Sequence, residues 1–161
     1  MSAPHPYLSG KAIILTGGSG DIGSATVRHL LAAGASVAAL DWAAGDARRR
    51  DAKVLAVTGF DIPWTIMITP TYTEADYSRD AEEMLNQAVA KVGANHPDVE
   101  IQTRLVQRKP AFALIEAAKD ADLLVVGSHG YGALPGMHLG SVATYCVHHA
   151  PCPVLVHRTG E

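Results

Sequence analysis

Cysteine, aromatic residues and long apolar runs are all scarce in this sequence of 161 residues. The two cysteines, Cys146 and Cys152, are too few for a disulfide scaffold and indicate a reducing compartment. No apolar run approaches the ~20 residues that span a bilayer, and the opening MSAPHPYLSG lacks the charged-then-apolar order of a signal peptide. We therefore expect a cytoplasmic protein without a membrane partner.

Positive charge is scarce as well. The 13 lysines and arginines face 16 aspartates and glutamates, which gives a formal net charge of −3, and no basic stripe runs along the chain. Nucleic acid is therefore not an expected partner, and the basic cluster Arg48–Arg50 is typical of a solvated helix end. The hydrophobic share of 48% and the 15 glycines are typical of α/β proteins, and the length fits a single α/β domain over residues 1–161.

Short apolar runs alternate with helical patterns along the chain. The clearest helix is predicted from about Thr73 to Val92, where apolar residues recur at i, i+3, i+4 and i+7, with TYTE as a capping-box candidate and Gly93 as a stop signal. Such alternation predicts a doubly wound, three-layer α/β/α fold with a parallel, Rossmann-like sheet. Six strands are expected, at Ala12–Thr16, Ser36–Leu40, Lys53–Val57, Val99–Val106, Leu123–Val126 and Val154–His157.

Residues 36–50 fit two structures. Alanine and leucine favour one continuous helix, although Gly45 in its middle costs roughly 1 kcal/mol; the alternative is a strand followed by a short helix. A helix here, directly after the one ending near Ala33, would make the strand at 53–57 antiparallel to the first strand. A strand keeps all six strands parallel, so we predict a strand at Ser36–Leu40.

The predicted strand at Val99–Val106 alternates apolar and polar side chains. A strand buried on both faces is nearly continuously apolar, so this strand belongs at an edge of the sheet. The order 3-2-1-4-5-6 would bury it beside the first strand. We therefore predict the order 4-3-2-1-5-6, which sets the first strand against Leu123–Val126.

The first candidate site is the stretch TGGSGDIG, with glycines at Gly17, Gly20 and Gly23. It follows a predicted strand and precedes a helix, whose free N–H groups and positive dipole end attract a pyrophosphate. Asp41 lies 24 residues after Gly17, at the predicted end of the second strand, where it would accept hydrogen bonds from ribose hydroxyls. The alternative is that Asp41 caps the following helix.

Residues 11–41 resemble the short-chain dehydrogenase/reductase superfamily in its TGxxGxxG form, and GFDI resembles that family's adenine-contacting pair. The family's catalytic Tyr-x-x-x-Lys is absent, because Tyr77 is followed four positions on by Ala81, and Tyr145 by His149. Without that proton relay we expect no dehydrogenase activity and assign no catalytic residue. The resemblance implies NAD as the cofactor, bound by Gly17, Ser19, Gly20, Ile22, Gly23, Asp41, Asp61 and Ile62.

The second candidate site is GSHGYGALPGMHLGS, which contains Gly-x2-Gly-x9-Gly-Ser. Its glycines bring backbone N–H groups and a hydroxyl to the start of the last helix, an arrangement that binds di- or triphosphates. This spacing, and the sequence around it over residues 42–158, resemble the universal stress protein family. The resemblance implies an adenine-nucleotide-hydrolase-like fold that binds ATP or ADP through Gly127, Ser128, His129, Gly130, Gly140 and Ser141. A glycine loop without a ligand is the alternative.

One departure separates the chain from that family. The family's first strand normally ends in an acid-glycine-serine turn, and Thr16-Gly17 stands at this place. We interpret the chain as a chimera of a dehydrogenase-like segment over 11–41 and a stress-protein-like segment over 42–158, engineered or, alternatively, a natural recombinant. The function expected first is non-catalytic binding of ATP or ADP. NAD binding, a scaffold without a ligand and slow ATP hydrolysis are the alternatives.

Histidine and cysteine gather near the end of the chain, at Cys146, His148, His149 and Cys152. These are metal-ligating residue types. The stretch HHAPCPVLV, however, resembles the usual last turn and strand of the stress-protein family. We therefore expect no metal there.

The apolar strand Val154–His157 is predicted at the sheet edge opposite Val99–Val106. An open edge exposes unpaired backbone N–H and C=O groups, which proteins seldom leave uncovered. Because universal stress proteins commonly pair this strand across a twofold axis, we expect a homodimer. The alternative is a monomer whose edge is blunted by Pro153 and Arg158.

Overall fold

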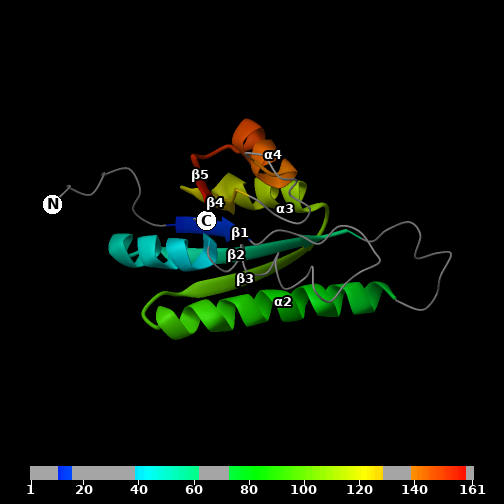
Figure 1. The fold of residues 1–161 in the computed structure, drawn as a ribbon, viewed down its shortest axis with the longest axis horizontal. Coiled ribbons are helices and arrows are strands. Elements are labelled where there is room, and N and C mark those ends of the chain that lie inside the picture. Colours follow the sequence, from blue (N-terminus) through cyan, green and yellow to red (C-terminus); the bar gives the residue numbers. More distant parts are fainter. Residues whose placement is uncertain (1–10, 16–38, 62–72, 129–138, 159–161) are drawn as a thin grey trace.

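The computed structural model describes residues 11–15, 39–61, 73–128 and 139–158. Five strands in these residues form one sheet in the order β3-β2-β1-β4-β5, and all neighbouring strands are parallel (Figure 1). The strands are β1 (Lys11–Leu15), β2 (Lys53–Phe60), β3 (Ile101–Gln107), β4 (Leu124–Gly127) and β5 (Val154–His157). The helices are one over residues 39–50, α2 (Glu74–Asn95), α3 (Pro110–Ala117), which the 3-10 turn η2 (Ala118–Asp120) continues, and α4 (Ser141–His149).

β1 lies at the centre of the sheet. Its residue Ile13 is aligned with Leu55 of β2 on one side and with Leu124 of β4 on the other. Because all five strands run in the same direction, their carboxyl ends meet at one end of the sheet. Ligands of open α/β sheets bind beyond these carboxyl ends, which makes this end the place to look for a site.

Helices cover both faces of the sheet and enclose two apolar cores. Val54 and Ala56 of β2 lie in the core under helix 39–50 and α2, whereas Leu55 and Val57 belong to the core under α3 and α4. This alternation is the two-residue period of a strand that is covered on both faces. Figure 1 shows α2 on one side of the sheet and α3 and α4 on the other, so the structure has the predicted three layers.

The predicted strand at Ser36–Leu40 is wrong, because residues 39 and 40 are helical; residues 36–38 lie outside the described part of the chain. Burial at helical spacing explains the helix. Burying a leucine such as Leu40 contributes roughly 1.5–3 kcal/mol, more than the ~1 kcal/mol that Gly45 costs. The described residues thus hold five strands rather than six. The residues buried along this helix, each at most 1% exposed, are Ala39, Leu40, Ala43, Ala44 and Ala47.

This helix has a well-defined end. Asp51 follows it with a left-handed backbone, at φ 54°. The N–H of Ala52 donates to the carbonyl of Ala47 at 2.9 Å, the long bond of a Schellman motif. β2 begins at the next residue and runs parallel to β1. The parallel pairing of these two strands, with the helix between them, overturns the argument that had favoured a strand.

Both predictions about the edges of the sheet are confirmed. If the missing second strand is left out, the predicted order 4-3-2-1-5-6 becomes the observed order. β3 lies at one edge, where the side chains of Gln102 and Arg104 are exposed and those of Ile101 and Leu105 are half-buried. β5 lies at the opposite edge.

α2 begins with a capping box. The Thr73 side chain accepts a hydrogen bond from the Asp76 N–H, and the Asp76 carboxylate accepts one from the Thr73 N–H at 2.8 Å. The box therefore lies two residues after the predicted TYTE position. The helix also continues past Gly93, the predicted stop, to Asn95. Within the described residues, no helix is long and apolar enough to cross a membrane.

Candidate functional site

The second glycine-rich segment joins the carboxyl end of β4 to the start of α4. Gly127 is the last residue of β4, Gly140 is the N-cap of α4 and Ser141 is its first residue. The N–H of Ser128 donates to the His157 carbonyl at 2.8 Å, and the Ser128 carbonyl accepts from the Gly140 N–H at 2.7 Å. These bonds bring the two ends of the segment together at the carboxyl end of the sheet.

Four of the six predicted phosphate-binding residues are therefore gathered in one place: Gly127, Ser128, Gly140 and Ser141. His129 and Gly130 lie outside the described residues. The bond between Ser128 and Gly140 also changes the role expected for Gly140, whose N–H was predicted to bind a phosphate. Because the Gly140 N–H is bonded to Ser128, this glycine closes the segment rather than offering its N–H to a ligand.

Within the described residues, nothing caps the N-terminus of α4. Its N-cap has no side chain, no side-chain hydrogen bond caps the helix and no acidic residue lies in its first turn. The first intrahelical bond runs from the Thr144 N–H to the Gly140 carbonyl at 2.9 Å. The preceding N–H groups, of Ser141, Val142 and Ala143, have no acceptor within the helix. Such groups, at the positive end of the helix dipole, can bind a phosphate.

The two donors beyond Ser141 were not predicted from the sequence. Valine and alanine carry no chemical signal, because only their backbone N–H groups could bind a ligand. Their role follows from the position at which α4 begins. The hydroxyl-bearing Ser141 is exposed and lies where a ligand could accept its hydrogen bond.

The first glycine-rich segment is mostly outside the described residues. Of the predicted dinucleotide-binding residues, the structure describes Asp41 and Asp61; Asp61 follows β2 and is exposed. Asp41 lies inside helix 39–50, and its Oδ1 is 3.1 Å from Nε2 of His96. It is therefore neither at a strand end nor at a helix cap, so both positions predicted for Asp41 are wrong. Those outside the described residues are Gly17, Ser19, Gly20, Ile22, Gly23 and Ile62.

Trp42, the residue after Asp41, packs near the candidate phosphate site. Its ring lies against the ring of His157, with centroids 6.4 Å apart and planes tilted by 34°. The backbone carbonyl of His157 accepts the hydrogen bond from Ser128. Helix 39–50 thus contacts the strand end to which the phosphate segment is attached.

Of the histidines and cysteines near the end of the chain, Cys146 is buried in the core, Cys152 is half-buried, and His148 and His149 are exposed. Cys146 is buried, which raises the pKa of its thiol to about 11, and burial also raises the pKa of the Cys152 thiol. The His149 ring stacks on Tyr145 at 4.0 Å between centroids, and its Nδ1 lies 2.9 Å from the Tyr145 carbonyl. In the parts of the chain that the structure describes, no three metal-ligating side chains are grouped.

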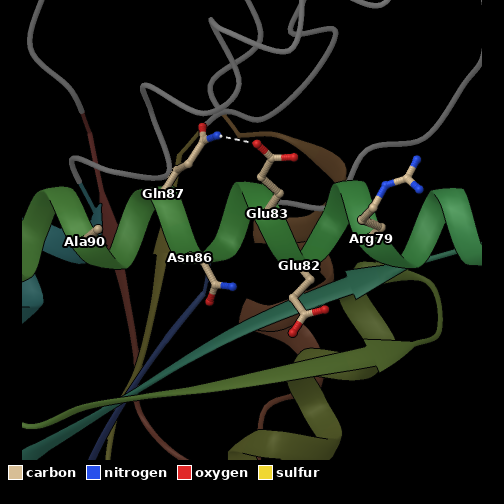
Figure 2. Close-up of a pocket in the computed structure, with 6 residues that line it drawn as sticks. All are labelled: Arg79, Glu82, Glu83, Asn86, Gln87 and Ala90. Carbon is tan, nitrogen blue, oxygen red and sulfur yellow. Dashed lines mark hydrogen bonds between the residues drawn. The ribbon is translucent and has the colours of Figure 1, made fainter.

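A hollow of ≈ 450 Å³ lies on α2, on the other side of the sheet from α4 (Figure 1). Figure 2 shows the lining side chains along this helix, with Gln87 donating a hydrogen bond to Glu83 at 3.1 Å. The residues recur at the spacing of a solvated helix face, and their charged members are one arginine and two glutamates. We do not place the site there. The lining residues are Arg79, Glu82, Glu83, Asn86, Gln87 and Ala90.

Comparison with known sequences gives a consistent result. Residues 33–158 match the universal stress protein family. A universal stress protein of Mycolicibacterium smegmatis is 33% identical over 156 residues, which cover 94% of this chain and 52% of that protein. One from Mycobacterium tuberculosis is 43% identical over 79 residues, covering 49% of this chain and 25% of that protein. The chain thus spans about half the length of these mycobacterial relatives, or less.

A shorter relative is matched over most of its own length. A universal stress protein of Thermus aquaticus is 34% identical over 120 residues, covering 72% of this chain and 85% of that protein. The M. smegmatis match extends across residue 41, where the sequence suggested a join. The comparisons give no support for a dehydrogenase module or for a chimera, and that interpretation is corrected.

Solved structures share the fold, an α/β, Rossmann-like one. UspA from Lactobacillus plantarum superposes with a TM-score of 0.69 at 22% identity, covering 96% of this chain and all of that chain. A universal stress protein in complex with cAMP superposes with a TM-score of 0.64 at 24% identity, covering 92% of this chain and 97% of that chain. The universal stress protein from Archaeoglobus fulgidus in complex with dAMP has a TM-score of 0.56 at 21% identity, covering 93% of this chain and 97% of that chain.

Proposed function

The chain belongs to the universal stress protein family, and on this premise we propose that it is a non-catalytic domain that binds ATP or ADP. The nucleotide's phosphates would lie at the N-terminus of α4, within the segment Gly127–Ser141. The observation that carries the proposal is the open helix start, where three successive N–H groups precede the first intrahelical bond. Two proteins of the same fold, in complex with cAMP and dAMP, support an adenine nucleotide as the ligand.

The electrostatics of α4 also support an anionic ligand. The first turn carries no acid, so nothing there repels a phosphate. The bond between Ser128 and Gly140 fixes the helix start to the end of β4, which orders the donors before a ligand arrives. His129 and Gly130 remain predicted members of this site, on the family resemblance.

NAD is the weaker ligand candidate. That hypothesis placed the Asp41 carboxylate at the end of a strand to hold a ribose, and Asp41 instead lies within a helix beside His96. We therefore keep NAD as a comparison ligand in the binding experiment. The proposal itself is limited to adenine nucleotides.

An exchange of Ser141 tests the phosphate site. An acid in the first turn stabilises a helix by about 0.3–1 kcal/mol, whereas the same charge repels a phosphate. Ser141→Asp should therefore raise the thermal midpoint of the ligand-free protein and weaken ADP binding in calorimetry at least tenfold. The neutral, nearly isosteric Ser141→Asn is the matched control and should keep most of the affinity. Equal ADP affinity in the aspartate variant would remove α4 from the site.

We further propose that the protein forms a homodimer through β5. This strand is the last in the sheet order, and its four side chains are only half-buried. A second β5 running antiparallel would pair its open edge.

The bonds of Leu124 and Ser128 to the Pro153 and His157 carbonyls turn the odd-numbered residues of β5 toward β4, so Val156 faces the open edge. Val156→Pro would remove one N–H donor from that edge and should convert the dimer to a monomer in light scattering. Val156→Ile, which keeps the donor and a β-branched side chain, is the control. A monomer mass for the unmodified protein at micromolar concentration would contradict the proposal.

A further inference from the structure

A histidine–aspartate contact joins helix 39–50 to the end of α2. His96 is the C-cap residue of α2, and its Nε2 lies 3.1 Å from Oδ1 of Asp41, 55 positions earlier in the chain. The His96 side chain is 16% exposed and the Asp41 side chain 48%. The contact therefore lies at the border between the core and solvent, and the nucleotide proposal makes no use of it.

The imidazole of His96 has a partner for only one of its nitrogens. Nδ1 is buried and has no hydrogen-bond partner among the described residues. The ring also packs closely on helix 39–50, since a Cβ at Gly45 would lie 3.7 Å from its Cε1. The neutral ring, with its proton on Nε2, donates one hydrogen bond to Asp41 and leaves a bare Nδ1. Protonation adds a charge and places a second N–H where no acceptor lies.

The charges around this contact decide what protonation does. Asp41 forms no ion pair with an arginine or lysine in the described residues. The negative end of the α2 dipole also lies at His96. Asp41 and the helix end are therefore the negative charges that face the ring. The neighbouring charges form their own pairs: Arg48–Asp98 at 2.7 Å, Arg49–Asp46 at 2.8 Å and Arg50–Asp46 at 2.6 Å.

We propose that Asp41 and His96 form a pH-sensitive latch between helix 39–50 and α2. With a neutral ring the latch is one hydrogen bond. With a protonated ring it is an ion pair, in which Asp41 compensates the charge on His96. Helix 39–50 is part of the crossover from β1 to β2, and its Trp42 packs on His157 at the end of β5. The latch thus fixes a helix that reaches from α2 to the far edge of the sheet.

A double-mutant cycle tests the latch. Urea unfolding is measured for the unmodified protein, Asp41→Asn, His96→Gln and the double variant at about pH 8 and about pH 5.5, a range in which histidine ordinarily titrates. Asparagine can accept the hydrogen bond but cannot neutralise an imidazolium. Asp41→Asn should therefore lower the unfolding midpoint more at pH 5.5 than at pH 8. With glutamine at position 96, it should have the same effect at both pH values.

Two results would overturn the latch. One is an equal effect of Asp41→Asn at both pH values; the other is a pH-dependent effect that persists in the His96→Gln background. Because a weakened variant can unfold in acid, the His96 ring signals are also followed by NMR in the folded protein. Asp41→Asn should move their titration to lower pH, whereas an unchanged titration would show that Asp41 does not support the charge.

Discussion

The N-termini of α2 and α4 lie at the same end of the sheet but differ in chemistry. At α2, Thr73 and Asp76 form a capping box, and the first turn carries the acids Glu74 and Asp76. At α4, the N-cap is Gly140, and the first turn has neither a side-chain cap nor an acid. The doubly wound fold provides several helix starts at this end of the sheet. Local sequence decides which of them can accept an anion.

α3 is a third case, closed by packing rather than by a cap. Its N-cap, Lys109, makes no side-chain cap bond, and Pro110 at the first position removes one N–H donor. The helix start lies tightly on β2: a Cβ at Gly59 would be 2.8 Å from both Pro110 Cα and Ala113 Cβ. Of these three helices, α4 alone leaves its first turn open.

The largest expected effect comes from breaking the packing under α3. Gly59→Ala would place a methyl group at 2.8 Å from backbone and side-chain atoms, so α3 must move away from the sheet. Overpacking of this kind typically costs about 1–3 kcal/mol, and we expect a loss of stability near the upper end of this range in urea unfolding.

Gly93→Ala is the matched control. Gly93 lies within α2, and a Cβ there would meet nothing within 4 Å. Alanine should stabilise the helix by about 0.5–1 kcal/mol. If Gly59→Ala were as stable as the unmodified protein or more stable, the close contact at Gly59 would not be real.

A smaller effect is expected from opening the capped start of α2. Thr73→Ala removes the hydroxyl that accepts from the Asp76 N–H, and loss of such a cap costs about 1 kcal/mol. Thr73→Ser keeps the hydroxyl and should retain most of the stability. The acids in the first turn stay in place, so the variant should not gain nucleotide binding. A loss of the same size in both variants would show that the hydroxyl does not cap the helix.

The smallest effect concerns pH. The hydrogen bond from the Thr73 side chain, followed by that from its backbone, lowers the pKa of Asp76. A lowered folded pKa means that the carboxylate contributes stability above the ordinary carboxyl pKa, and that this contribution is lost as the pH falls through the folded pKa. Asp76→Asn should therefore be less stable than the unmodified protein at neutral pH, and the two unfolding curves should converge in acid. A constant difference across that range would contradict the cause assigned here.

Much of the architecture could be predicted from local patterns. Apolar runs predicted the five strands that the structure describes, together with the strand at 36–40 that proved wrong. The polar alternation around Gln102 and Arg104 correctly placed β3 at an edge. The segment over residues 39–50 could not be assigned, because short apolar residues suit both a buried helix and a buried strand. What decides between them is contact with α2, which lies far away in the sequence.

The candidate site was only partly predictable for a similar reason. The spacing of glycines indicated the segment before α4. It did not indicate that the Gly140 N–H donates a hydrogen bond to the Ser128 carbonyl. The partner of Asp41 carried no motif at all, since His96 lies 55 positions away and meets it only through packing. Contacts between distant elements, rather than local chemistry, account for these errors.

The central claim is that α4, and not α2, presents its first N–H groups to a nucleotide. Backbone amide NMR during an ADP titration measures these groups directly. The account predicts saturable shifts for the amides of Ser141, Val142 and Ala143, with those of Glu74 and Asp76 unchanged. Amides of α4 that do not move, while ADP binds elsewhere or does not bind, would contradict it.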